Sequence, residues 1–112
     1  MPTAKKMYSI TLTITAKKDE FDSFVAKEFN GERFFTVKRE DITSWGVEGM
    51  VCKFTHDDLG DTYAYEKLLS RYPSLFLKIE WTSGSKTGIC ICQSGVVQHM
   101  EWVEDDLCFR SH

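Results

Sequence analysis

The spacing of apolar residues changes several times along the chain, and each change marks a predicted element. From residue 8 to residue 14, apolar side chains alternate with polar ones, which is typical of a strand with one buried face. From residue 17 to residue 30, phenylalanine and valine recur at offsets of three and four, which predicts an amphipathic helix. Asn30 and Gly31 would end this helix, because glycine accepts the left-handed geometry that follows a last helical turn.

The middle of the chain predicts one or two strands and a second helix. A short β-prone segment spans 34–37, and a longer strand spans 45–54. Gly46 and Gly49 interrupt the longer segment, so we expect that strand to be bent. The second helix begins at Asp61 or Thr62 and runs to Tyr72, because Pro73 prevents its continuation.

The last third of the chain predicts a β-meander. A strand ending at Trp81 leads through a turn at 83–85 into a strand over 86–92, and a second turn leads into a strand over 96–103. Leu75, Leu77, Ile79 and Trp81 share one face of the first strand. In the last strand we expect Val96, Met100 and Trp102 to face the core.

These elements predict a single domain over residues 1–112, with 1–6 and 104–112 peripheral. The fold class is α+β, because helices alternate with strands and the loops are short. We expect a ferredoxin-like arrangement in which two helices pack on one face of a mainly antiparallel sheet, with an extended C-terminal β-meander.

Composition and charge exclude several classes of protein. With 42% hydrophobic residues, the chain can build a core without disulfides. Its net charge of −3 and scattered lysines disfavour general nucleic-acid binding. No apolar run approaches the roughly 18 residues of a membrane-spanning helix, and no secretory signal opens the chain. The four cysteines are then free thiols, and we expect a bacterial cytoplasmic protein that binds no membrane.

Three segments resemble a known family. They are "SITLTITAKKDEFDSFVAKEF", "SWGVEGMVCKF" and "YEKLLSRYPSLFLKIEW". They are similar to the first strand and helix, the central strand, and the second helix with its following strand in the YubB-type ferredoxin-like domain family. That family consists of small phage- and plasmid-encoded bacterial proteins of unknown function. The resemblance implies a ferredoxin-like fold and a mobile-element origin, and it assigns no functional residue.

The cysteines and histidines do not predict a metal site or a catalytic centre. Cys90 and Cys92 point the same way on a strand, and Cys52 could lie on a neighbouring strand near His56 or His99. A structural zinc site normally needs two paired clusters, so buried thiols are favoured and neither a metal nor a cofactor is expected.

Catalysis by a nucleophile would need a base beside it. His56, His99 and His112 are far apart in the chain, and none accompanies a catalytic cysteine signature. We therefore expect a protein that is not an enzyme. A small enzyme of unknown class remains the third hypothesis.

The aromatic residues of the strands are the best candidates for a binding surface. Our leading hypothesis is a protein-binding domain acting on a host or defence protein, with homodimerisation through an open sheet edge as a companion prediction. The partner-binding candidates are Trp45, Trp81, Trp102 and Tyr8. The alternative is a nucleic-acid-binding module that uses the same aromatics. Its phosphate contacts would be Lys5, Lys6, Lys17 and Lys18.

Overall fold

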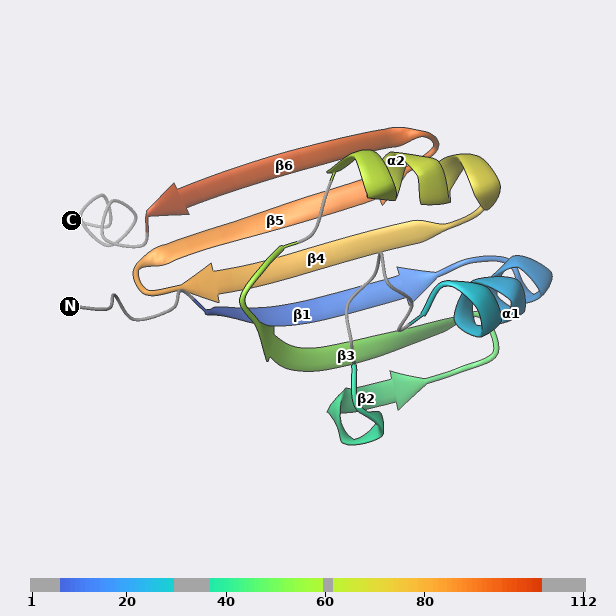
Figure 1. Cartoon of the computed structure of the whole chain (residues 1–112), viewed down its shortest axis with the longest axis horizontal. Helices are drawn as coiled ribbons and strands as arrows, with labels where there is room; N and C mark the ends of the chain where they lie inside the picture. The colour runs from blue at the N-terminus through green and yellow to red at the C-terminus, as the bar shows by residue number, and fades with distance from the viewer. Residues whose placement is uncertain (1–6, 30–36, 60–61, 104–112) are drawn as a thin grey trace, which may run out of the picture.

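The computed structural model describes residues 7–29, 37–59 and 62–103. In this part of the chain, six strands form one antiparallel sheet in the order β2-β3-β1-β4-β5-β6 (Figure 1). The strands are β1 (Tyr8–Thr15), β2 (Ile42–Trp45), β3 (Gly49–His56), β4 (Phe76–Ser83), β5 (Lys86–Gln93) and β6 (Val96–Val103).

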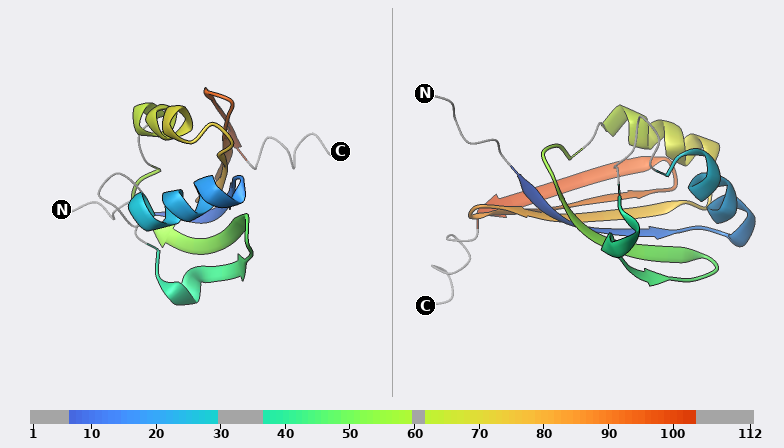
Figure 2. Two further views of the ribbon diagram at one scale, coloured as in Figure 1. Left: turned by 90° about the vertical axis from the view of Figure 1, so that its right-hand side faces the viewer. Right: turned by 60° about the horizontal axis from the view of Figure 1, so that its bottom comes forward.

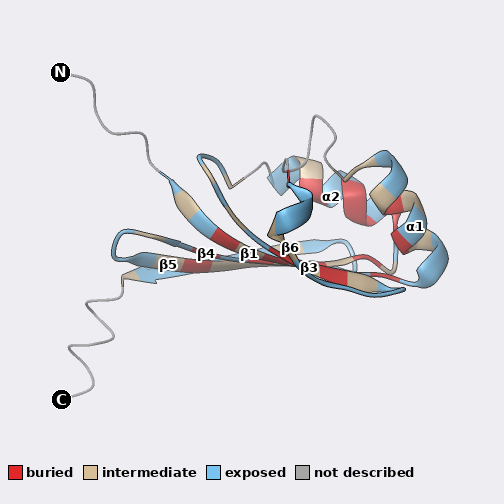
Figure 3. Ribbon diagram, turned by 90° about the horizontal axis from the view of Figure 1, so that it is seen from below, coloured by how far each residue is buried: buried red, intermediate tan, exposed pale blue. Residues whose placement is uncertain are grey.

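The helices lie on one face of this sheet. They are α1 (Lys18–Lys27), α2 (Thr62–Arg71) and the single 3-10 turn η1 (Arg39–Asp41). Both α-helices stand on the same side of the strands in two views (Figure 2). The opposite face carries no helix from the described part of the chain (Figure 3). Neither helix is long and apolar enough to cross a membrane.

The core lies between the helices and the covered face of the sheet. The alternation predicted for β1 is confirmed, since Ile10, Leu12 and Ile14 are at most 2% exposed. The partners of these three residues across the β1–β4 ladder are Trp81, Ile79 and Leu77, which are buried as well. The helices contribute five side chains that are at most 5% exposed: Phe21, Phe24, Tyr65, Leu68 and Leu69.

Two polar contacts join the ends of the helices. The Glu20 carboxylate accepts hydrogen bonds from the backbone N–H of Ser74, at 2.7 Å, and from its hydroxyl. At the other end of α1, the Glu28 carboxylate accepts from Arg71 Nη1 at 2.7 Å and from the Tyr72 hydroxyl at 2.9 Å. Both ends of α1 are thereby tied to the segment that closes α2.

The predicted strand over 45–54 is two strands. β2 ends at Trp45 and β3 begins at Gly49, and the backbone N–H of Gly46 donates to the carbonyl of Gly49 at 2.7 Å. A Cβ at Gly49 would lie 2.9 Å from the carbonyl oxygen of Ile14, so glycine permits the close approach of β1. Of the β-prone segment 34–37, Val37 is buried outside any strand and the rest lies outside the described residues.

The expectation that Val96, Met100 and Trp102 face the core is wrong. Their side chains are 52%, 61% and 37% exposed, and the register with β5 places them on the face of the sheet opposite the helices. Val97 packs against the core instead. The sequence did not reveal this because both residues of the Val96–Val97 pair are apolar, so the alternation along β6 fits either face.

The expected ferredoxin-like fold is also wrong. β5 pairs with β4 from Lys86 to Cys92 and β6 pairs with β5, so the meander belongs to the main sheet and β4 is an interior strand. The resulting six-stranded sheet fits the βαββαβ unit of a ferredoxin-like domain only loosely. Apolar spacing locates strands but does not say which strands become neighbours.

Candidate functional site

The face of the sheet opposite the helices is polar along β1 and mainly apolar along β5 and β6. On β1 it presents only hydroxyl side chains, from Ser9 to Thr15 at every second position. On β5 and β6 it presents Ile89, Ile91, Met100 and Trp102, which we call the open-face patch. The register places Ile89 directly opposite Met100. On this face of the sheet, these apolar side chains therefore lie beside one edge, at β5 and β6.

Two hollows mark the surface around the open-face patch. One of about 350 Å³ is lined by Ile89, Ile91 and Met100 together with Gln98 and His99. The other, of about 710 Å³, extends from Trp102 over Thr87 and Ile89 towards Lys53 and Glu80. A flexible methionine and an indole beside shallow hollows are typical of surfaces that accept a partner side chain.

Charged groups on this face flank the patch rather than interrupt it. On β4, Lys78 Nζ lies 3.6 Å from Glu80 Oε1, so these opposite charges lie together. Lys53 stands on β3, two strands from β4. An apolar centre with a polar border is the usual anatomy of a protein interface.

The two edges of the sheet are protected to different degrees. β2 has four residues and a register shift between Ile42 and Ser44, and short, irregular edge strands pair poorly with other chains. β6 has eight residues in unbroken register with β5, and Glu101 is its single charged residue. The long, regular edge therefore borders the open-face patch.

The four predicted partner-binding aromatics do not share one surface. Trp102 lies in the open-face patch. Trp81 is 3% exposed on the helix side, where Tyr8 meets it edge-on with ring centroids 5.3 Å apart. Trp45, 56% exposed, also lies on the helix side and packs against Phe21 at 5.9 Å.

The predicted phosphate contacts lie away from Trp102. Lys17 and Lys18 are at the start of α1, on the helix side, and Lys18 Nζ pairs with Asp22 at 3.2 Å. Lys5 and Lys6 lie outside the described residues. The structure therefore does not place Lys17 or Lys18 beside the exposed indole.

The three cysteines in the described part of the chain lie on two strands, Cys52 on β3 and Cys90 and Cys92 on β5. Cys52 is on β3, and β1 and β4 separate it from β5, so the expectation that it neighbours Cys90 and Cys92 is wrong. The thiols of Cys90 and Cys92 are 3.8 Å apart. Within 7–29, 37–59 and 62–103, no three His, Cys, Asp or Glu side chains are grouped so that they could hold a metal ion.

His99 lies directly opposite Cys90 on β5, which sequence spacing alone could not show. Its Nε2 accepts a hydrogen bond from Trp81 Nε1 at 3.3 Å. The thiol of Cys90 contacts Cys92, and this hydrogen bond lowers the pKa of Cys90. Cys90 and His99 therefore make their polar contacts with different residues, unlike the nucleophile and base of a catalytic pair.

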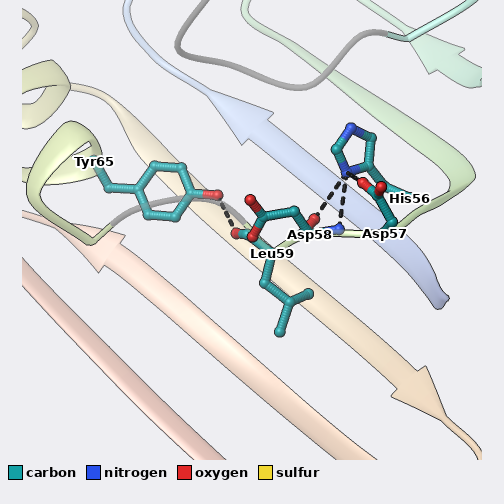
Figure 4. Close-up of polar contacts among 5 residues, drawn as sticks. All are labelled: His56, Asp57, Asp58, Leu59 and Tyr65. Carbon is teal, nitrogen blue, oxygen red and sulfur yellow. Dashed lines mark hydrogen bonds and ion pairs between the residues drawn. The ribbon is translucent and has the colours of Figure 1, made fainter. Parts of the chain in front are cut away.

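His56 belongs to a network in the connection from β3 to α2, which crosses over the helix side of the sheet (Figure 4). Its Nδ1 lies 3.1 Å from the backbone nitrogen of Asp58 and 3.5 Å from Asp57 Oδ1. The Tyr65 hydroxyl donates to the carbonyl of Leu59. These contacts hold the loop against the first turn of α2.

The open-face patch is thus the strongest candidate for a functional surface. It includes Trp102, one of the four predicted partner-binding aromatics. Met100, Ile89 and Ile91 were missed because the alternation of β5 and β6 does not say which face the helices cover. A comparison with protein-family models, curated proteins and solved structures finds no match to this chain.

Proposed function

We propose that this chain is a non-enzymatic protein-binding domain that holds its partner on the open-face patch. The observation that carries the proposal is the exposure of Met100 and Trp102, at 61% and 37%, on a sheet face that carries no helix in the described part of the chain. Burying such side chains against a partner removes apolar surface from water, and each Å² contributes about 25 cal/mol before the costs of association.

The resemblance of the first strand and helix to the YubB-type family supports a phage- or plasmid-encoded origin. We propose that the protein acts in the bacterial cytoplasm and that its partner is a host or defence protein. Its contact surface would present apolar side chains that fill the hollows beside Met100 and Trp102.

The test is capture from bacterial lysate with variants of the patch. The double variant Met100→Gln, Trp102→Gln keeps the length of β6 and replaces the two side chains that β6 contributes to the open-face patch. We expect it to reduce the amount of a specifically captured protein about tenfold or more, because central aromatic residues carry much of the energy of an interface.

Val47→Gln is the matched control for this experiment. Val47 is 64% exposed, but it lies between β2 and β3, away from the patch. Capture should be unchanged in this variant, and circular dichroism should show both variants folded. Capture that survives loss of the patch, or that depends equally on Val47, would contradict the proposal.

The second candidate is single-stranded nucleic-acid binding on the same face. It is favoured by one observation, that Trp102 and Lys53 line a single hollow. An indole can stack on a base while a lysine contacts the phosphate. Fluorescence anisotropy with a short labelled oligonucleotide at low salt tests it, because electrostatic contacts are strongest there. Absence of binding, or binding unaffected by Lys53→Ala, would eliminate this candidate.

A further inference from the structure

We propose that β6 pairs edge to edge with β6 of a second copy of this chain, in antiparallel orientation, around a two-fold axis at Met100. This inference goes beyond the proposed function, because the open-face patch could hold a partner on a single chain. It starts from the contrast between the short, irregular edge at β2 and the long, regular edge at β6. Edge strands that lack lysine, proline and bulges pair readily with another strand.

The turn before β6 determines which backbone groups point outward. Gln93 and Val96 flank a two-residue loop in which Ser94 and Gly95 have φ values of 51° and 76°, as in a type I′ turn. In such a turn the N–H of Val96 bonds to the carbonyl of Gln93. Antiparallel ladders alternate, so every second residue from Val96 bonds to β5. The N–H and C=O groups of Val97, His99, Glu101 and Val103 then point away from β5.

Antiparallel pairing with a second copy must match these outward groups and keep the two covered faces on the same side. A two-fold axis at Met100 meets both conditions. It places His99 opposite Glu101 of the second copy and Val97 opposite Val103 of the second copy, and each of these pairs occurs twice. Met100 then lies opposite Met100 of the second copy.

Moving the axis by one residue removes this complementarity. With the axis at His99, the two His99 side chains lie opposite each other and Glu101 lies opposite Val97, so the carboxylate faces a valine. Opposite charges or hydrogen-bonding groups across strands are favourable, whereas mismatched pairs are not. The side chains of β6 therefore select the axis at Met100.

In this register, His99 can donate a hydrogen bond to the carboxylate of Glu101 of the second copy. Its Nε2 already accepts the Trp81 indole N–H, so the neutral ring carries its proton on Nδ1. On the acceptor side, Lys86 Nζ lies 3.6 Å from Glu101 Oε2. This places a cation beside the carboxylate that would accept the imidazole hydrogen bond.

Pairing in this register also joins the two open-face patches. On that face, Met100 lies opposite its own copy and Gln98 lies opposite Trp102 of the second copy. The dimer would present one continuous apolar surface, roughly twice the size of the single patch. A partner bound there would contact both chains.

The native mass of the purified protein tests the pairing directly. Light scattering over a concentration series should give twice the 13.0 kDa of one chain. Glu101→Pro removes an outward N–H without removing a bond to β5, and proline is tolerated at such edge positions. We expect this variant to be a monomer, while Val47→Gln stays a dimer. A monomeric wild-type protein would overturn the proposal.

A disulfide test identifies the register and does not depend on whether Glu101→Pro folds. Met100→Cys is made in a Cys108→Ser background, with Gln98→Cys as the matched control on the same face. A pair at a two-fold axis without mutual backbone bonds has Cα atoms about 4.5 Å apart, within the range of a disulfide. Mild oxidation, which forms one S–S bond and passes two electrons to the added oxidant, should give a covalent dimer of Met100→Cys alone.

The other outcomes of this test overturn the register. Crosslinking of Gln98→Cys alone would put the axis at Gln98, and crosslinking only in a mixture of the two variants would put it at His99. The β6 dimer and the proposed protein-binding function can be contradicted independently of each other. A monomer that still captures a protein through the open-face patch overturns the dimer and supports the proposed function, whereas a dimer that captures nothing does the reverse.

Discussion

The indole of Trp81 lies directly on the backbone of Gly88, its partner across the β4–β5 ladder. A Cβ at Gly88 would come within 2.3 Å of the ring atoms Cε2 and Cζ2. Glycine at this position lets the large, 3% exposed ring of Trp81 cover β5. This contact packs β4, which carries Trp81 in the core, closely against β5 of the C-terminal meander.

Substitution of Gly88 by alanine should destabilise the fold. The added methyl group forces the buried Trp81 ring to move, and overpacking of this kind costs about 1–3 kcal/mol in the free energy of unfolding. Denaturant unfolding measures the difference. Gly46→Ala is the control, because the nearest atom to its added Cβ is 3.7 Å away, and we expect a change within about 0.5 kcal/mol. Equal effects of the two substitutions on the free energy of unfolding would show that the contact with Trp81 does not restrict residue 88 to glycine.

Loss of the Ser74 hydroxyl should make stability less dependent on pH. Hydrogen bonds from Ser74 lower the pKa of Glu20 below its ordinary value of 4.5. A lowered pKa stabilises the folded state above the ordinary value, and this contribution disappears as the pH falls through the folded pKa. The difference in stability between wild type and Ser74→Ala should therefore be larger at about pH 7 than at about pH 3.

Part of the Ser74→Ala effect should remain in acid. The Ser74 hydroxyl also accepts the backbone N–H of Lys17 at 2.9 Å, and that bond does not titrate with Glu20. Urea unfolding at both pH values measures the two parts. A Ser74→Ala difference that is the same at both pH values would contradict the role of Glu20.

The contact between Tyr72 and Glu28 should show energetic coupling. The phenol donates to the carboxylate at 2.9 Å, and burial, followed by this hydrogen bond, raises the pKa of Tyr72. Tyr72→Phe should cost about 1 kcal/mol in the wild-type background and less in a Glu28→Ala background. A double-mutant cycle by thermal unfolding measures the coupling. Additive effects would mean that the hydroxyl contributes nothing through Glu28.

Among the described thiols, Cys90 should react first with an alkylating reagent. The thiolate is the reactive form, and its population falls as the pKa rises. Burial is the main reason that the pKa of Cys52 is raised to about 11, and the hydrogen bond with Cys90 raises the pKa of the fully buried Cys92. Peptide mass spectrometry after brief alkylation of the native protein distinguishes the sites. Earlier labelling of Cys52 or Cys92 would contradict this order.

The local elements of this chain follow from its sequence. The alternation in β1 predicted that strand and its buried face, and Pro73 marked the end of α2. Both predictions depend on residues that are close together in the sequence, where spacing decides which side chains share a face of a strand or helix. The boundary at Gly46 and Gly49 was harder to place, because glycines that bend a strand and glycines that divide two strands have the same local pattern.

The candidate site could be predicted only in part. Trp102 was identified from its residue type, but Trp81 belongs to the same strand-aromatic class and is buried against Gly88. Residue type does not separate an aromatic anchor from a core aromatic. The separation depends on which face the helices cover, and that is a contact between segments far apart in the chain.

The sequence by itself determined where most strands and helices form and which residues alternate along them, because these properties depend on near neighbours. Only the tertiary structure decided the strand order β2-β3-β1-β4-β5-β6, that Met100 and Trp102 are exposed, and that β6 is the long edge. The physical reason is that strand order and face are set by pairing between distant segments. In β6, with Val96 and Val97 side by side, the local pattern was compatible with either face.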